Sequence, residues 1–234
     1  MTQLLEDLNR YHQLLQQDCD RIIILLPPIY TGYDRQLASA MQCLGYNREQ
    51  FKFIIVQPFK LYAFHKPSQQ VQPIRDILPR ELLKAVSLNA LKWYGFSVPL
   101  TSVAPLNISP VGQAKDSDRY HRISNFWRKC SHLLQEVQGQ NTIPEVSLKT
   151  LDRESWESPL ANQLVDLLNA TPQILQQSAG EFALHLICKH VEMLCDSGDR
   201  WLEIFNSTSE NDLLLATTHK TLQDLLVNIL GLQF

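Results

Sequence analysis

The spacing of apolar residues changes near residue 112, and this change limits the folds open to the chain. Before it, short apolar runs alternate with helix-like stretches, as in a sheet whose strands are joined by helices. After it, almost every segment has apolar residues at helical spacing. We therefore expect an α/β fold, with a small, mostly parallel sheet of three or four strands in residues 1–112 and a C-terminal helical bundle in residues 113–234. We expect the two regions to pack as one unit, because no long flexible linker separates them.

Two apolar runs predict the first pair of strands. Residues 21–26 are rich in Ile and Leu and end at two prolines, and residues 51–57 form the second run. Between them lies a predicted helix over about 35–44, which Gly45 ends because glycine adopts a positive φ at little cost. A strand, a helix and a second strand in this order predict a right-handed unit with two parallel strands.

Further elements follow from the same kinds of pattern. Residues 59–65 and 96–103 are predicted as strands, the second of them at an edge because Pro99 has no N–H to donate. Thr171-Pro172 has the form of a helix start, and Ser197-Gly198 the form of a helix end. The predicted helices with bounds are residues 3–17, 79–94, 116–138, 182–194 and 211–230. Another predicted helix starts at Ser158-Pro159, and Gly180 is expected to break or bend the helical stretch after Thr171-Pro172.

Composition and charge limit the classes of protein to consider. Hydrophobic residues make up 44% of the 234 residues and the formal net charge is −3, so nucleic-acid binding would need a local basic patch. No apolar run approaches the roughly 20 residues that span a bilayer. Five scattered cysteines without CxxC spacing are typical of reduced thiols. We expect a cytoplasmic protein with no membrane contact.

Several chemistries lack support in the sequence. The chain has no GxGxxG, GxxxxGK[ST] or GxSxG motif, so dinucleotide, P-loop and serine-hydrolase sites are disfavoured and no cofactor is expected. One predicted helical face carries four residues of the types that ligate metals, at positions i, i+3, i+7 and i+10. The helical rise spreads them over roughly 15 Å, which is too far for all four to bind one ion. We therefore expect no metal. These four residues are His185, Cys188, Glu192 and Cys195.

A basic stripe on the helix predicted at 116–138 is the candidate nucleic-acid site. Cations with an aromatic residue among them follow helical spacing, which suits contact with a phosphate backbone. The alternative is an ordinary solvated helix face, on which Arg stems cover apolar neighbours. The candidate residues are Lys115, Arg119, Arg122, Phe126 and Lys129, with Arg128 beside them.

The loop after the first strand is a second candidate site. In sheets of this kind, ligands bind where strands end, and Tyr30, Thr31 and Asp34 lie there. Together with His65, they could hydrogen-bond a ligand and form an uncommon enzyme site. The alternative is a loop in which Asp34 only caps the following helix.

The sequence favours a non-enzymatic adaptor or accessory subunit of an intracellular complex, acting through protein–protein interaction. This hypothesis rests on the missing catalytic motifs and on Leu-rich helices at both ends, whose apolar faces must be buried. It predicts a protein partner. Two alternatives remain open: a nucleic-acid-associated subunit that uses the basic stripe Lys115–Lys129, and an enzyme that uses the loop residues.

Overall fold

The computed structural model describes eight stretches of the chain, and the ranges are residues 2–17, 19–57, 60–65, 70–73, 79–103, 105–107, 119–138 and 158–233. Two compact units divide the chain: Met1–Lys60 with Leu100–Pro105, and Leu61–Pro99 with Leu106–Phe234. This division differs from the expected boundary at residue 112, because residues 61–99 group with the later helices. No helix in the described ranges is both long enough and apolar enough to span a bilayer.

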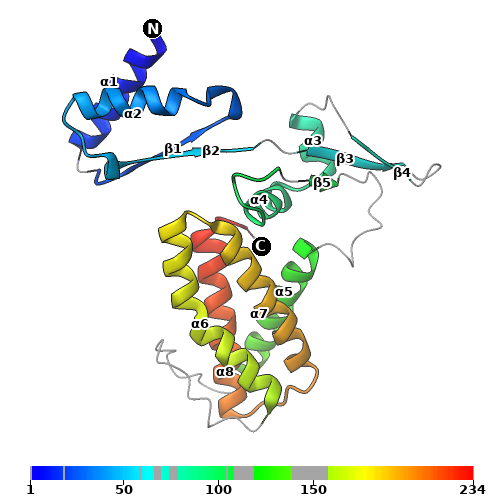
Figure 1. Cartoon of the computed structure of the whole chain (residues 1–234). Helices are drawn as coiled ribbons and strands as arrows, with labels where there is room; N and C mark the ends of the chain where they lie inside the picture. Colours follow the sequence, from blue (N-terminus) through cyan, green and yellow to red (C-terminus); the bar gives the residue numbers. More distant parts are fainter. Residues whose placement is uncertain are drawn as a thin grey trace. The chain divides into compact units, whose positions relative to one another are not determined.

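A parallel pair of strands forms the centre of the first unit (Figure 1). Strand β1 (Ile22–Leu26) pairs with β2 (Phe51–Ile55) so that Ile22 lies opposite Phe51 and Leu26 opposite Ile55. The helix α2 (Tyr33–Cys43) connects them, with one short 3-10 turn before it and one after it. The predicted unit of two parallel strands joined by a helix is therefore confirmed, with element ends within two residues of those expected.

Two tyrosines attach the N-terminal helix α1 (Thr2–Gln16) to this unit. The hydroxyl of Tyr33, at the start of α2, donates a hydrogen bond of 2.6 Å to the Asp7 carboxylate. The hydroxyl of Tyr46 bonds the His12 ring. Burial and the bond to Asp7 raise the pKa of Tyr33, so this phenol stays protonated and keeps donating at neutral pH. The apolar face of α1 thereby covers the core formed by β1 and α2.

The remaining strands form a separate sheet. Strands β3 (Lys60–His65), β4 (Gln70–Pro73) and β5 (Pro105–Asn107) have the order β4-β3-β5, and β3 and β4 are antiparallel. The prediction of one mostly parallel sheet with three or four strands is therefore not confirmed. The strand expected at residues 96–103 is wrong, because helix α4 (Leu88–Phe96) extends into it and turns follow.

Helices make up most of the second unit. The single helix predicted from Pro79 is broken at Ser87, whose hydroxyl accepts from the Ala90 N–H at 3.2 Å and so caps α4. Besides α4, the helices of this unit are α3 (Pro79–Ala85), α5 (Arg119–Gln138), α6 (Pro159–Glu181), α7 (Leu184–Leu202), α8 (Ser209–Gln223) and the π-helix η4 (Asp224–Ile229). Helices α4 to α8 and η4 pack around a common core that includes Trp93, Ile123, Leu164, Leu194 and Leu214.

Two predicted helix boundaries are wrong for the same reason. Pro172 lies inside α6 and Gly198 lies inside α7, where the sequence predicted a start and an end. In α7, apolar residues are buried on both sides of Gly198. In α6, apolar residues are buried before Pro172, and Leu175 after it packs partly buried against the same core. This packing outweighs the roughly 1 to 3 kcal/mol that Gly or Pro costs within a helix. Local signals were therefore overridden by packing.

Gly198 allows α5 and α7 to approach closely. A Cβ atom built on Gly198 would lie 2.3 Å from Cζ of Phe126, whose side chain is fully buried. Real Cβ contacts are much longer, so a larger residue at position 198 would displace the ring or the helix. This contact brings the facing surfaces of α5 and α7 within reach of one another.

We expect Gly198→Ala to destabilise the second unit by about 1 to 3 kcal/mol, because an added methyl overpacks a filled core. The matched control is Gly180→Ala in α6, where nothing lies within 4 Å of the added Cβ. That variant should gain less than about 1 kcal/mol from helix propensity, because Gly180 lies one residue before the C-terminal end of α6. Urea unfolding followed by circular dichroism measures both variants. Equal effects would show that the contact with Phe126 does not limit packing.

Candidate functional site

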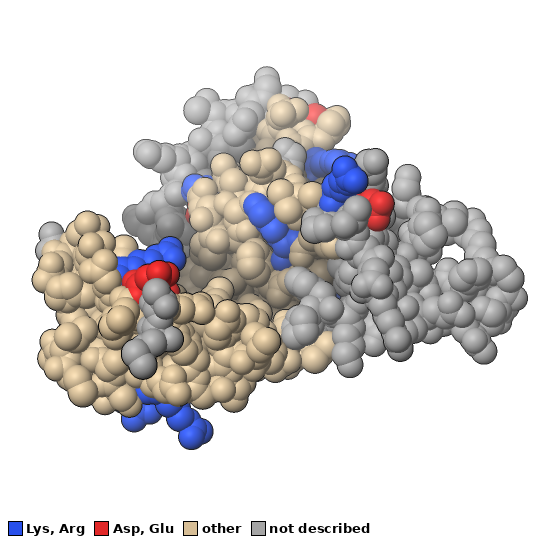
Figure 2. Space-filling view, turned by 90° about the horizontal axis from the view of Figure 1, so that it is seen from above, with Lys and Arg blue, Asp and Glu red and all other residues tan. Residues whose placement is uncertain are grey.

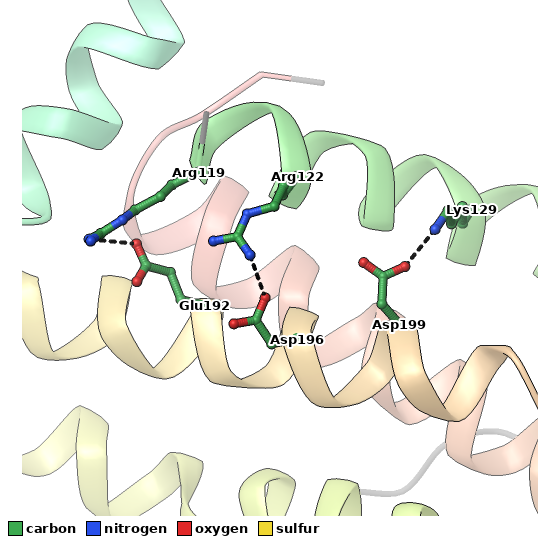
Figure 3. A network of polar contacts seen from close by, with 6 residues as sticks. All are labelled: Arg119, Arg122, Lys129, Glu192, Asp196 and Asp199. Atoms are coloured by element: carbon green, nitrogen blue, oxygen red, sulfur yellow. Dashed lines mark hydrogen bonds and ion pairs between the residues drawn. The ribbon is translucent and has the colours of Figure 1, made fainter. Parts of the chain in front are cut away.

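Three ion pairs join α5 to α7 along one surface (Figure 3). The Arg119 guanidinium lies 3.5 Å from Glu192, and the Arg122 guanidinium lies 3.1 Å from Asp196. The third pair joins the Lys129 ammonium to Asp199 at 2.6 Å. Partners occur in the same order on both helices, so α5 and α7 run parallel where they face each other. We call these six residues the α5–α7 ion pairs.

The cations of the α5–α7 ion pairs remain accessible to solvent. The side chains of Arg119, Arg122 and Lys129 are 61%, 47% and 58% exposed. Exposed pairs of this kind contribute only about 0 to 1 kcal/mol each, because water screens the charges and two long side chains lose freedom. A phosphate could therefore replace a carboxylate partner at small cost.

The structure separates the other members of the predicted basic stripe. Phe126 is fully buried against Gly198, so its ring is not available to a nucleic-acid base. Lys115 lies outside the described residues. Arg128 is exposed and has no ion pair within the described part of the chain. The helical spacing used in the sequence therefore combined surface cations with one core residue.

Arg128 borders a groove between α5 and the C-terminal end of α7. The groove has a volume of about 970 Å³, and Leu133 and Leu202 supply its apolar walls. Its charged lining residues are Arg128, Lys129, Asp199 and Glu203, and His132 also lines it. His132 also pairs with Glu136 at 3.3 Å. Arg128 is thus the cation of this surface that lacks a carboxylate among the described residues.

The sequence analysis missed the acidic side of this surface. Glu192, Asp196 and Asp199 have spacings of four and three residues, which place them on one face of α7. That spacing matches a basic stripe on a parallel neighbouring helix, and it was visible in the sequence. Glu192 was instead grouped with the metal-ligand types, because the pairing of α5 with α7 is a tertiary property.

Two of the four α7 residues that could have ligated a metal are instead part of the core. Cys188 and Cys195 are buried in the core, and burial raises the pKa of Cys188 to about 12. A thiol with such a pKa is protonated at neutral pH and is a poor metal ligand. Within the described ranges, no three His, Cys, Asp or Glu side chains are grouped as metal ligands would be.

The loop residues occupy ordinary turn positions. Thr31 donates through its hydroxyl to the Pro28 carbonyl at 2.6 Å, and Asp34 accepts from the Gly32 N–H at 2.9 Å. The ring of Tyr30 packs against Tyr33 with 5.8 Å between centroids. His65 lies in β3, and β3 belongs to the separate sheet. A ligand site formed by these residues stays a prediction.

Lysine and arginine side chains form small, separate groups on the face shown in Figure 2, and some lie next to acidic side chains. This distribution agrees with the net charge of −3. Recognition of an anionic partner by the described surface would depend on local groups of cations and not on a field over the whole molecule.

Comparisons with known proteins relate the chain to arginine–tRNA ligases. Over 193 residues it is 25% identical to the arginine–tRNA ligase of Oceanobacillus iheyensis, and this covers 81% of the chain and 34% of that enzyme. It is 21% identical to the Mesoplasma florum enzyme over 220 residues, covering 91% of the chain and 38% of that enzyme. No family model matches the chain. The chain spans about a third of the length of these relatives.

Solved structures show the same fold. A Campylobacter jejuni protein named as an arginyl-tRNA synthetase aligns with 97% of the chain at a TM-score of 0.77 and 16% identity, and the match covers 50% of that protein. The Plasmodium falciparum arginyl-tRNA synthetase aligns with 97% of the chain at a TM-score of 0.64 and 14% identity, with 43% of its own chain covered. The fold is therefore that of a part of arginyl-tRNA synthetases.

These findings correct the functional prediction. A non-enzymatic adaptor or accessory subunit acting through protein–protein interaction is wrong, because the related proteins are tRNA ligases by name. The expected protein partner has no support among them. Missing catalytic motifs exclude only the reactions that those motifs serve, so their absence does not indicate a non-enzymatic role.

One buried histidine, His190, and one half-buried histidine, His219, predict a pH dependence of stability. Burial lowers the pKa of His190, which bonds Thr171 at 2.9 Å, and of His219, which bonds Ser131 at 2.9 Å. As pH falls below about 7, the unfolded chain binds protons before the folded chain does, so the free energy of unfolding should fall. It should stop falling below the lowered pKa values, where the folded state is protonated too.

Urea unfolding at several pH values between about 7.5 and 5.5 tests this dependence. We expect His190→Gln with His219→Gln to reduce the loss of stability over that interval, since Gln keeps a hydrogen-bonding group without a charge change. The solvent-exposed His121, changed to Gln, is the control for removal of a histidine. An unchanged pH dependence in the double variant would contradict the assignment.

Proposed function

We propose that this chain binds tRNA and contributes that binding to the ligation of arginine to tRNA, the reaction for which its relatives are named. The observation that carries the proposal is the likeness of fold to arginyl-tRNA synthetases over 97% of the chain. Sequence similarity over 81% of the chain to an arginine–tRNA ligase supports it independently. The likeness of fold supports tRNA as the class of partner, and the contacts are proposed to lie on the surface of α5.

The proposed contacts are phosphates of the tRNA backbone with Arg119, Arg122, Arg128 and Lys129. These cations follow the outer side of α5, and Arg guanidinium groups suit phosphate because they donate two parallel hydrogen bonds. Lys115 belongs to the same helical spacing in the sequence and stays part of the proposal. Phe126 does not, because its ring lies in the core.

The carboxylates of α7 compete with the tRNA for the same cations. Each phosphate that binds Arg119 or Arg122 must displace Glu192 or Asp196 from the guanidinium. The displacement costs little, since an exposed pair contributes at most about 1 kcal/mol. The displaced carboxylates stay close to the bound phosphates, however, and repel them. The acidic residues should therefore weaken binding without preventing it.

Removal of the α5 cations should reduce tRNA affinity and its salt dependence. For Arg119→Gln/Arg122→Gln/Arg128→Gln, we expect the plot of log K against log salt to become less steep by about 2 to 3, because each lost phosphate contact removes roughly 0.9. Fluorescence anisotropy with labelled tRNA measures both quantities. The control is Arg10→Gln/Lys189→Gln/Lys220→Gln, which removes three exposed cations elsewhere. Absence of tRNA binding by the unaltered chain at about 50 mM salt would refute the proposal.

Removal of the α7 carboxylates should have the opposite effect. We expect Glu192→Gln/Asp196→Asn/Asp199→Asn to raise tRNA affinity by roughly three- to tenfold, because the cations lose their competitors and the local repulsion disappears. Glu6→Gln/Glu181→Gln/Glu210→Gln makes the same change in net charge at exposed positions away from the α5–α7 ion pairs. If both variants raise the affinity equally, overall charge and not competition explains the effect.

A further inference from the structure

A groove whose two walls carry opposite charge lies beside the last of the α5–α7 ion pairs. Lys129 and Asp199, the two residues of that pair, both line it (Figure 3). Further along the two helices, Leu133 lines it from α5, and Leu202 and Glu203 line it from the end of α7. Its volume of about 970 Å³ lies within the range of small-ligand sites. We call this the α5–α7 groove.

The α5 wall of the groove carries hydrogen-bond donors and the α7 wall carries acceptors. Arg128 and Lys129 line it from α5, and Asn125 adds a side-chain amide one turn before Arg128. Asp199 and Glu203 line it from α7, where a spacing of four residues puts both on one face. Such a groove suits a ligand with an anionic group on one side and hydrogen-bond donors on the other.

Two charged side chains of the groove have no partner among the described residues. Arg128 and Glu203 form no ion pair there, whereas Lys129 is paired with Asp199. Both unpaired side chains are exposed to solvent. A ligand in the groove therefore gains these two contacts without displacing a carboxylate, unlike a phosphate that binds Arg119.

An unpaired nucleotide matches both walls. Its phosphate can accept two parallel hydrogen bonds from the Arg128 guanidinium. Arg128 also belongs to the cations that follow the outer side of α5, so an RNA backbone that binds these cations leads into the groove. Leu133 and Leu202 are partly buried and offer apolar surface to the faces of a base. Unpaired bases are commonly held by such contacts and read along their Watson–Crick edges.

Guanine is the base whose edge best matches a carboxylate. Its Watson–Crick edge has two adjacent donors, N1–H and the N2 amino group, for the two acceptor oxygens that Glu203 presents. Cytosine and adenine have one amino donor beside a ring nitrogen that only accepts. Uracil has a carbonyl oxygen on each side of its N3–H, and a carboxylate repels both oxygens.

We propose that the α5–α7 groove binds an unpaired guanosine nucleotide, with its phosphate on Arg128 and its base edge on Glu203. Glu203 is then a residue that determines specificity, while the other α5 cations bind phosphates of any sequence. The choice of an RNA nucleotide rests on the proposed function. A zwitterionic amino acid such as free arginine also carries both charges, and the experiment distinguishes it.

Three labelled oligonucleotides of about ten nucleotides test the groove in the whole chain. One contains uridine alone, the second has one central guanosine, and the third has inosine there, which lacks the N2 amino group. We expect guanosine to raise the affinity about fivefold or more over uridine, the lower limit of discrimination by a good bidentate contact, and inosine to fall between them.

Glu203→Gln should reduce the preference for guanosine to less than about twofold, because Gln keeps the size of the side chain but presents one acceptor oxygen in place of two. The matched control is Glu181→Gln, which makes the same change in net charge at an exposed position at the end of α6. It should keep the full preference. Circular dichroism of each variant verifies folding.

The outcomes separate the groove from the α5 surface. A guanosine preference that is lost in Glu203→Gln supports the groove even if intact tRNA does not bind. Equal affinity for the three oligonucleotides, or no binding of any of them at about 50 mM salt, overturns the groove site, whereas the α5 contacts are judged by tRNA binding. A preference that persists in Glu203→Gln overturns the assignment to this carboxylate. Competition by free arginine at the concentration of the oligonucleotide assigns the groove to an amino acid and overturns its assignment to RNA.

Discussion

The contact between Phe126 and Gly198 determines how the helical surface is assembled. Because Gly198 has no side chain, the Phe126 ring fills the space beside it and α5 and α7 lie close together. The α5–α7 ion pairs form along the edge of that contact. They are too exposed to hold the helices together themselves. Apolar packing therefore determines how closely α5 and α7 approach, and the charged side chains pair where that packing places them.

This division of roles leaves the surface charges free to serve another purpose. A buried ion pair is costly to break, because each ion has lost its hydration. The α5 cations keep much of theirs, so an exchange of carboxylate for phosphate changes the electrostatic energy little. A surface with weak internal pairs can bind RNA and return to its unbound state without any rearrangement of the core.

The sequence predicted what depends on local patterns. The run at residues 22–26, stopped by prolines, and the helix signals before residue 51 define the parallel pair β1 and β2. The helix boundaries predicted at Pro172 and Gly198 were wrong, since packing on both sides of each residue keeps the helix intact. The separate antiparallel pair of β3 and β4 was not predicted, because alternation identifies strands but not the direction of their partners.

The site was predicted less well than the fold, for a physical reason. Helical spacing identified Arg119, Arg122 and Lys129 as one face of α5 but placed Phe126 among them, because one turn of a helix carries both a core residue and its exposed neighbours. The partners Glu192 and Asp196 depend on which helix packs against α5, and a single sequence does not give that. Phosphate recognition also needs no motif, since it requires only cations at suitable distances. A search for catalytic motifs therefore does not detect such a surface. The absence of those motifs is no evidence against a role in tRNA chemistry.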